Sequence, residues 1–177
     1  MAISLNVVGR AHQAAGGAGF TWFVYGSSLD AEAFSAWAQD HGYRVPDFSA
    51  ARPARLPGWR LAFDAPSRMW GGPVASLLEA PGEAVEGLAV PMPGEARGLV
   101  EHKEGAVSGL YEAVEVTLET EAGPTPAVAF RVAAARRLPS EGPPAPAYLD
   151  VMLRGARAHG LSAAWIGRLE ALQRGTP

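Results

Sequence analysis

The stretch TWFVYGSSLDAEAFSAWAQDHG, residues 21–42, decides how the fold begins. Residues 21–25 are aromatic and β-branched and stop at Gly26, as a buried strand does when it ends in a tight turn. Asp30 is then suited to cap a helix that ends before Gly42. Aromatic and apolar side chains recur along this helix at helical spacing: Phe34, Trp37, Ala38 and His41. A strand, a turn and a helix therefore follow one another directly.

Alternating patterns predict more strands in the middle of the chain. Residues 113–120 alternate Val or Leu with Glu or Thr, as in a sheet with one wet face, and residues 127–132 repeat this alternation. The turn-rich connection at residues 121–126 predicts an antiparallel hairpin with a loop of ordinary length. Three shorter strands, separated by turns that contain glycine and proline, are expected at residues 59–63, 76–79 and 86–90.

The end of the chain predicts two helices. After a proline-rich linker at residues 138–145, Pro146 opens a helix that closes at Gly160, and Ser162 caps a last helix. Residues 43–56 carry prolines and arginines without a clear period, and we expect a loop there. Many short strands between an early helix and two late helices indicate an α+β fold, a small curled sheet with flanking helices.

The length and composition limit the domain organisation and the partners. The 177 residues, 48% of them hydrophobic, predict one domain over residues 20–177, preceded by a flexible leader at residues 1–19. The formal net charge of -3 provides no excess of positive charge, so nucleic acid and membrane surfaces are not expected as partners. No signal peptide or membrane-length apolar window is seen, which predicts a cytoplasmic protein. The richness in Ala, Arg, Gly and Pro is typical of a GC-rich bacterial source.

The familiar catalytic motifs fail on their spacing or their context. There are no cysteines, and the four histidines have neither metal-site spacing nor a carboxylate cluster, so we expect no metal and no other cofactor. The glycines at residues 16–19 precede a strand instead of following one, which excludes a dinucleotide fingerprint, and there is no P-loop. Ser27 and Ser28 lack the GxSxG pattern of a serine hydrolase.

Three local features remain as candidates for chemistry, and one of them is Tyr148 on the Pro146 helix, for which a position facing the core is the default interpretation. In the turn at residues 25–29, successive backbone N–H groups at the start of a helix can face a carboxylate or a developing oxyanion. Taken alone, such a turn is more commonly structural. The segment EHKEG, residues 101–105, is a solvated polar turn in its simplest interpretation, and periodicity does not distinguish Glu104 from its neighbours.

Several short blocks in order along the chain resemble one known family. These blocks are YGSSL at residues 25–29, WGGPVAS at 70–76, PGEAVEG at 81–87, EG at 104–105 with SGLY at 108–111, and a helix with Tyr148 that ends in Gly160-Leu161. Their order and spacing resemble the gamma-glutamylcyclotransferase family, also described as the gamma-glutamylcyclotransferase-like or AIG2-like fold. The likeness covers about residues 23–172. Ser28 stands where the family's YGSNL turn has asparagine.

The resemblance implies a small β-barrel-like sheet with helices around it and a pocket between the YGSSL turn and a catalytic glutamate. Glu104 matches that glutamate. The substrate-binding residues expected from the resemblance and from the turn are Tyr25, Gly26, Ser27, Ser28, Leu29, Tyr111 and Tyr148. The implied reaction is attack by the α-amine of a γ-glutamyl compound on its own γ-amide carbonyl, which releases 5-oxoproline and a free amine or amino acid. Glu104 then acts first as base and afterwards as acid.

Alternatives stay open at this point. The substrate is a small γ-glutamyl molecule, and γ-glutamyl amines or a γ-glutamyl-protected natural product would undergo the same chemistry. A non-catalytic binding module would keep the turn but need no acid. A domain without a pocket predicts Glu104 exposed and far from Gly26. A homodimer is compatible with the sequence, which does not fix the oligomeric state.

Overall fold

The computed structural model describes residues 17–175, so most of the predicted leader, residues 1–19, lies outside the described part. The strands are β1 (Phe20–Val24), β2 (Arg52–Ala65), β3 (Val74–Met92), β4 (Tyr111–Thr120) and β5 (Gly123–Val132). The helices are α1 (Ala31–Asp40), α2 (Arg97–Lys103), α3 (Pro146–Ala158) and α4 (Ala163–Gln173). Short 3-10 turns are η1 (Ser27–Leu29), η2 (Gly94–Ala96) and η3 (Ala134–Arg136).

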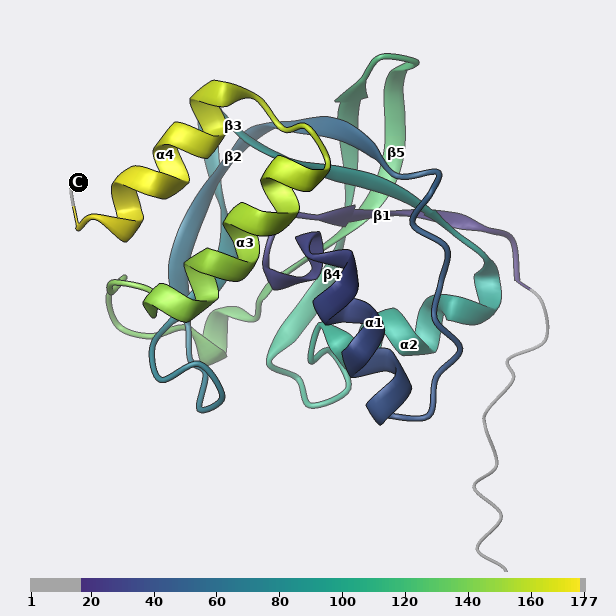
Figure 1. The fold of residues 1–177 in the computed structure, drawn as a ribbon, viewed down its shortest axis with the longest axis horizontal. Helices are drawn as coiled ribbons and strands as arrows, with labels where there is room; N and C mark the ends of the chain where they lie inside the picture. Colours follow the sequence, from purple (N-terminus) through teal and green to yellow (C-terminus); the bar gives the residue numbers. More distant parts are fainter. Residues whose placement is uncertain (1–16, 176–177) are drawn as a thin grey trace, which may run out of the picture.

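The strands close into a barrel in the order β1-β3-β2-β4-β5, and the helices lie around it (Figure 1). The parallel pairing of Trp22 with Val128 joins β1 to β5 and closes the ring, while the other neighbours are antiparallel. Trp22 also packs against Phe34 of α1, with 5.6 Å between the ring centroids, so that α1 is held against β1. The expected α+β fold with a barrel-like sheet is confirmed.

Side-chain caps at two helix starts are confirmed where the sequence predicts them. The Asp30 carboxylate accepts hydrogen bonds from the amides of Glu32 and Ala33, both at 3.1 Å, and α1 follows. The Ser162 hydroxyl accepts from the Trp165 amide at 3.1 Å at the start of α4. Each cap satisfies amide donors that have no partner inside the helix, which is why these residue types mark the boundary so reliably.

The prediction of separate strands at residues 76–79 and 86–90 is wrong, because both belong to the single long strand β3. Between the pairs Trp59–Glu79 and Pro57–Ala84, four residues of β3 lie opposite one residue of β2. The glycine of the intervening Pro-Gly-Glu segment has a φ of 90° and its counterpart in β2 has a φ of 78°. The proline and glycine that suggest a turn therefore form a bulge, which bends the strand around the barrel.

Two loops were predicted too long. Residues 52–56, expected as part of a loop, belong to β2, where buried Ala54 and Leu56 alternate with exposed arginine and proline side chains. The hairpin loop expected at residues 121–126 is a two-residue turn, because Thr120 already pairs with Gly123. The prolines that follow lie in β5 before its pairing with β1, where a missing N–H is tolerated.

Helix α2 was not predicted, and the expected polar turn at residues 101–105 is wrong for its first part. Residues 101–103 form the end of α2, and Glu104 follows as its C-terminal cap. This seven-residue helix is short, and its anchoring side chains, Leu99 and Val100, are adjacent, so no helical period develops. Tertiary packing of these two residues therefore fixes the helix and the position of Glu104.

Candidate active site

The YGSSL turn lies at one end of the barrel, between β1 and α1. Gly26 follows the strand, and η1 leads directly into the helix. Inside the turn, the Leu29 amide donates to the Gly26 carbonyl at 3.1 Å. Leu29 is fully buried and takes no part in the cavity wall. The structure therefore brings Tyr25, Gly26, Ser27 and Ser28 to the cavity and leaves Leu29 outside it.

Helix α3 fixes this turn by close packing at two glycines. A Cβ atom at Gly155 of α3 would lie 2.2 Å from the Leu29 carbonyl carbon, and a Cβ at Gly26 would lie 2.9 Å from the Tyr148 hydroxyl oxygen. Because real Cβ atoms do not approach so closely, only glycine lets the helix and the turn meet at these distances. The turn is consequently held in one position relative to Tyr148.

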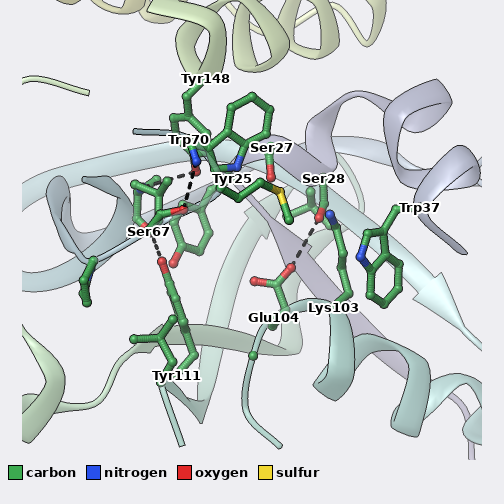
Figure 2. Close-up of a pocket in the computed structure, with 18 of the residues that line it drawn as sticks. Tyr25, Ser27, Ser28, Trp37, Ser67, Trp70, Lys103, Glu104, Tyr111 and Tyr148 are labelled. Carbon is green, nitrogen blue, oxygen red and sulfur yellow. Dashed lines mark hydrogen bonds between the residues drawn. The ribbon is translucent and has the colours of Figure 1, made fainter. Parts of the chain in front are cut away.

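A cavity of about 220 Å³ lies beside the turn, and Glu104 and Tyr111 line it from the other side (Figure 2). The side chain of Glu104 is half-buried, with its carboxylate directed into the cavity. The Ser28 hydroxyl donates a hydrogen bond to Glu104 Oε1 at 3.3 Å. Glu104 and the turn that contains Gly26 thus share one cavity, which contradicts a domain without a pocket.

The electrostatics of Glu104 suit proton transfer near neutral pH. Burial raises its pKa from 4.5 to about 7, while the Lys103 charge and the Ser28 hydrogen bond act in the opposite direction. A carboxyl group with this pKa is protonated in part of the molecules and ionised in the rest at neutral pH. It can therefore accept a proton and return it without a large free-energy cost.

Two buried tyrosines, Tyr25 and Tyr148, and the partly buried Tyr111 form the inner end of the cavity. The Tyr111 hydroxyl donates to the Ala75 carbonyl, and the Tyr25 hydroxyl donates to the Phe130 carbonyl. The Tyr148 oxygen instead accepts a hydrogen bond from the Ala75 amide at 3.2 Å, and the Ser27 amide also donates to it. Burial raises the pKa of all three hydroxyls, so they stay protonated. Tyr148 alone of the three therefore keeps its hydroxyl proton for a ligand.

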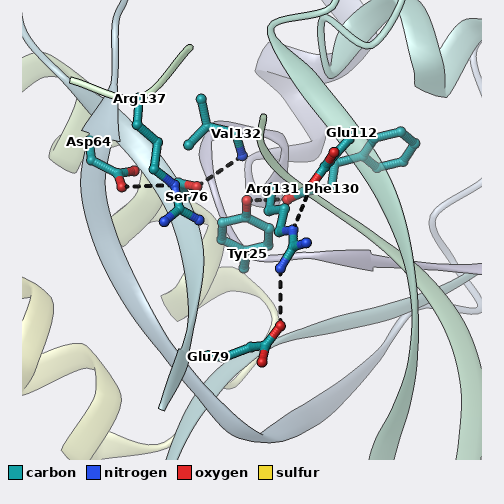
Figure 3. Close-up of polar contacts among 9 residues, drawn as sticks. All are labelled: Tyr25, Asp64, Ser76, Glu79, Glu112, Phe130, Arg131, Val132 and Arg137. Atoms are coloured by element: carbon teal, nitrogen blue, oxygen red, sulfur yellow. Dashed lines mark hydrogen bonds and ion pairs between the residues drawn. The ribbon is translucent and has the colours of Figure 1, made fainter. Parts of the chain in front are cut away.

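Polar contacts near Tyr25 hold β3 against β4 and β5 (Figure 3). Ser76 Oγ accepts from the Val132 amide at 3.0 Å. Arg131 bridges Glu112 at 2.8 Å and Glu79 at 3.2 Å, which ties the three strands together. Because Ala75 lies next to Ser76 in β3, these contacts also fix the backbone groups that Tyr111 and Tyr148 bind.

Comparison with known proteins agrees with this geometry. The gamma-glutamylcyclotransferase of Bos taurus is 30% identical over 161 residues, which cover 89% of this chain and 80% of that protein. The chain belongs to the gamma-glutamylcyclotransferase family. The gamma-glutamylcyclotransferase of Homo sapiens is 28% identical over 158 residues, covering 87% of this chain and 79% of that protein.

Two further comparisons, one with a family model and one with a solved structure, agree with membership of this family. The model of the AIG2-like family matches residues 84–169, a segment that contains Glu104 and Tyr148. A solved structure described as a gamma-glutamyl cyclotransferase superposes with a TM-score of 0.72 at 25% identity, covering 86% of this chain and 87% of that one. This member of the gamma-glutamylcyclotransferase family therefore shares its barrel fold with that solved structure.

The sequence did not identify three side chains that line the cavity: Trp37, Trp70 and Lys103. Trp37 fits the helical period of α1, and this period alone indicates a helix and gives no sign of a cavity. Trp70 packs edge-on against Tyr148 with 5.2 Å between ring centroids, and its position in the WGG block was the available signal. Lys103 had a clearer signal, since it directly precedes Glu104 and is the only lysine in the sequence.

Neither metal ligands nor a membrane helix are found in the described part of this family member. Over residues 17–175, no group of three or more His, Cys, Asp or Glu side chains is arranged to hold a metal ion. No helix within the same residues is long and apolar enough to span a membrane.

Proposed function

We propose that this family member is a gamma-glutamylcyclotransferase in which Glu104 transfers the protons. The observation that carries the proposal is a carboxyl group with a pKa of about 7, enclosed in a small cavity opposite a turn rich in amide donors. The substrate supplies its own nucleophile, because the α-amine of a γ-glutamyl compound can reach its side-chain carbonyl and close a five-membered ring. The enzyme then needs only to fold the substrate and move protons.

In the proposed sequence, Glu104 first takes a proton from the α-ammonium group. The freed amine attacks the γ-carbonyl carbon, a new N–C bond forms, and the carbonyl oxygen becomes an oxyanion. When the tetrahedral intermediate collapses, the original amide C–N bond breaks and Glu104 returns its proton to the departing nitrogen; Glu104 then takes the surplus proton of the ring nitrogen and passes it to the released amine, which leaves as its ammonium form. The products are 5-oxoproline and a free amine or amino acid, and Glu104 ends in its starting state.

Tyr148 and the turn are proposed to stabilise the negative charges of the substrate. The Tyr148 oxygen already accepts from backbone amides, so its proton can be donated to the substrate carboxylate or to the oxyanion. The amides of Gly26 and Ser28 are proposed as further donors. Tyr25 and Tyr111 donate their hydroxyl protons to backbone carbonyls. We therefore propose that these two tyrosines shape the inner wall of the cavity and do not stabilise charge on the substrate.

Ser28 is proposed to position the catalytic carboxyl group. Its hydroxyl donates to Glu104, and as a serine it is shorter than the asparagine of the usual family turn. The space that the shorter side chain leaves would then be available to the substrate. We also propose that residues 20–177 form one catalytic domain, because β1, α2, β4 and α3 all contribute to one site. Cytoplasmic location and bacterial source stay predictions from the sequence.

Detection of 5-oxoproline tests the proposal. Purified protein is incubated with γ-glutamylalanine, glutathione and γ-glutamylethylamide, and cyclised product is measured by mass spectrometry. Glu104→Gln keeps the shape of the side chain but cannot transfer protons, and we expect kcat to fall by about 10²-fold to 10⁴-fold. Glu101→Gln, in the helix that Glu104 caps and paired with Arg97, is the matched control. Near wild-type turnover by Glu104→Gln would refute the mechanism, and binding without turnover by the wild type would favour the binding module.

A further inference from the structure

Lys103 is an unusual cation in this chain. It is the only lysine among 15 basic side chains, the other 14 being arginines. It ends α2, lines the cavity next to Glu104, and its Nζ lies 5.0 Å from the centroid of the Trp37 ring. None of the ion pairs formed within residues 17–175 includes it. The charge of Glu104 and the Trp37 ring act on this half-buried ammonium group, but no carboxylate of the described residues lies within ion-pair distance of it, which leaves room for the anion of a ligand.

The cavity has a buried end and an outer end, with Glu104 between them (Figure 2). Tyr25 and Tyr148 enclose the inner end, and each is 4% exposed. Lys103 and Trp37 form the outer end, where the Trp37 ring stacks on the exposed ring of His41 at 4.3 Å between centroids. The glutamyl group is the same in every substrate and suits the enclosed end. The departing amine varies between substrates and would then extend past Glu104 toward Lys103.

On the basis of the proposed function, we propose that Lys103 binds the carboxylate of the departing amino acid. The ammonium group then selects γ-glutamyl amino acids over γ-glutamyl amines, which have no carboxylate at that position. A lysine suits this task because it is a compact point charge on a flexible stem, whereas the planar fork of an arginine would occupy more of a cavity of about 220 Å³. Trp37 supports the ammonium group through its ring face.

A matched pair of substrates isolates this contact. γ-Glutamylalanine and γ-glutamylethylamide differ only in the carboxylate of the departing group, so the ratio of their kcat/KM values reports on that carboxylate alone. Any effect of Lys103 on the protonation of Glu104 acts on both substrates and cancels in the ratio. We expect the wild type to prefer γ-glutamylalanine, and Lys103→Gln to reduce the ratio by about 10-fold to 100-fold, the range for a hydrogen bond between charged groups. Lys103→Arg should retain part of the preference.

Arg97→Gln is the control, since Arg97 belongs to the same helix but pairs with Glu101 outside the cavity. Its ratio should equal that of the wild type, and an equal reduction there would overturn the proposal. A wild type without preference, or an unchanged ratio in Lys103→Gln, would also overturn it while leaving the cyclotransferase function intact. If the wild type forms no 5-oxoproline from either substrate, the proposed function itself fails. If Lys103→Gln does not fold, two measurements on the wild type replace it: its preference between the two substrates, and its inhibition by the products alanine and ethylamine. Equal inhibition by alanine and by ethylamine would overturn the proposal.

Discussion

Replacing Glu104 by glutamine should make the protein more stable above neutral pH. The pKa of Glu104 is about 7 in the folded state against an ordinary value of 4.5, so the folded protein binds its proton more tightly than the unfolded chain does. At 1.36 kcal/mol per pH unit, ionisation of Glu104 costs the folded state roughly 3 kcal/mol once the pH exceeds 7. Glutamine keeps the shape without the charge, and Glu104→Gln should recover most of this free energy.

The sign of the effect fixes its pH window. Below pH 4.5, Glu104 is protonated in both states, and the variant should match the wild type in free energy of unfolding. The advantage of the variant should grow between pH 4.5 and about 7 and stay constant above that. For a protein of this size, roughly 3 kcal/mol corresponds to an increase in Tm of about 6–12 °C.

Urea unfolding at pH 4.5, 5.5, 6.5 and 8 measures this difference directly, and effects of other groups cancel between the two proteins. Glu101→Gln serves as the control for loss of a carboxylate from α2. A variant no more stable than the wild type at pH 8, or one whose advantage is the same at every pH, would show that burial does not raise the pKa of Glu104 as argued.

Three further substitutions test other parts of the site. Ser28→Ala removes a hydrogen bond that lowers the pKa of Glu104, so the acidic limb of the kcat/KM profile should move to higher pH; a shift to lower pH would contradict the assigned donor. Tyr148→Phe should lower kcat/KM by about 10-fold to 100-fold and cost about 1–3 kcal/mol in stability, because backbone amides lose their acceptor; activity within twofold of the wild type would exclude Tyr148 as a donor. Gly155→Ala should reduce stability by about 1–3 kcal/mol or more in thermal unfolding, because its Cβ would meet Leu29; a wild-type Tm would refute the tight contact.

Signals that act within a few residues could be predicted from the sequence. The caps at Asp30 and Ser162 are local hydrogen bonds, and the alternation in residues 113–120 follows from one sheet face being exposed. Prolines led to wrong predictions where the barrel bends, because a proline in a flat sheet suggests a turn. In the structure Pro81 lies in a bulge and Pro124 lies in a strand. Curvature of this kind depends on pairing with distant strands, which no local pattern contains.

The site could be predicted only in outline. Glu104 is one of many glutamates in the sequence, and its importance was suggested by its place in the ordered family blocks and not by any period. Its environment comes from α2, which was missed, and from Ser28, which is 76 residues away in the chain. Lys103 could not be predicted from the sequence either, because a lysine beside a glutamate is ordinary in a solvated turn. It becomes informative only in the structure, where both residues line the cavity.

The raised pKa of Glu104 depends on packing between residues that take no part in catalysis. A carboxyl group that costs roughly 3 kcal/mol when ionised would relax toward water if its surroundings could open. They are prevented from doing so at two glycine contacts: a Cβ at Gly87 would lie 2.2 Å from the Val24 carbonyl oxygen, and one at Gly155 equally close to Leu29. These contacts hold β1 against β3 and the turn against α3, on the side of the cavity opposite Glu104. The raised pKa depends on burial, and we therefore expect that loosening either contact would admit water and lower the pKa of Glu104.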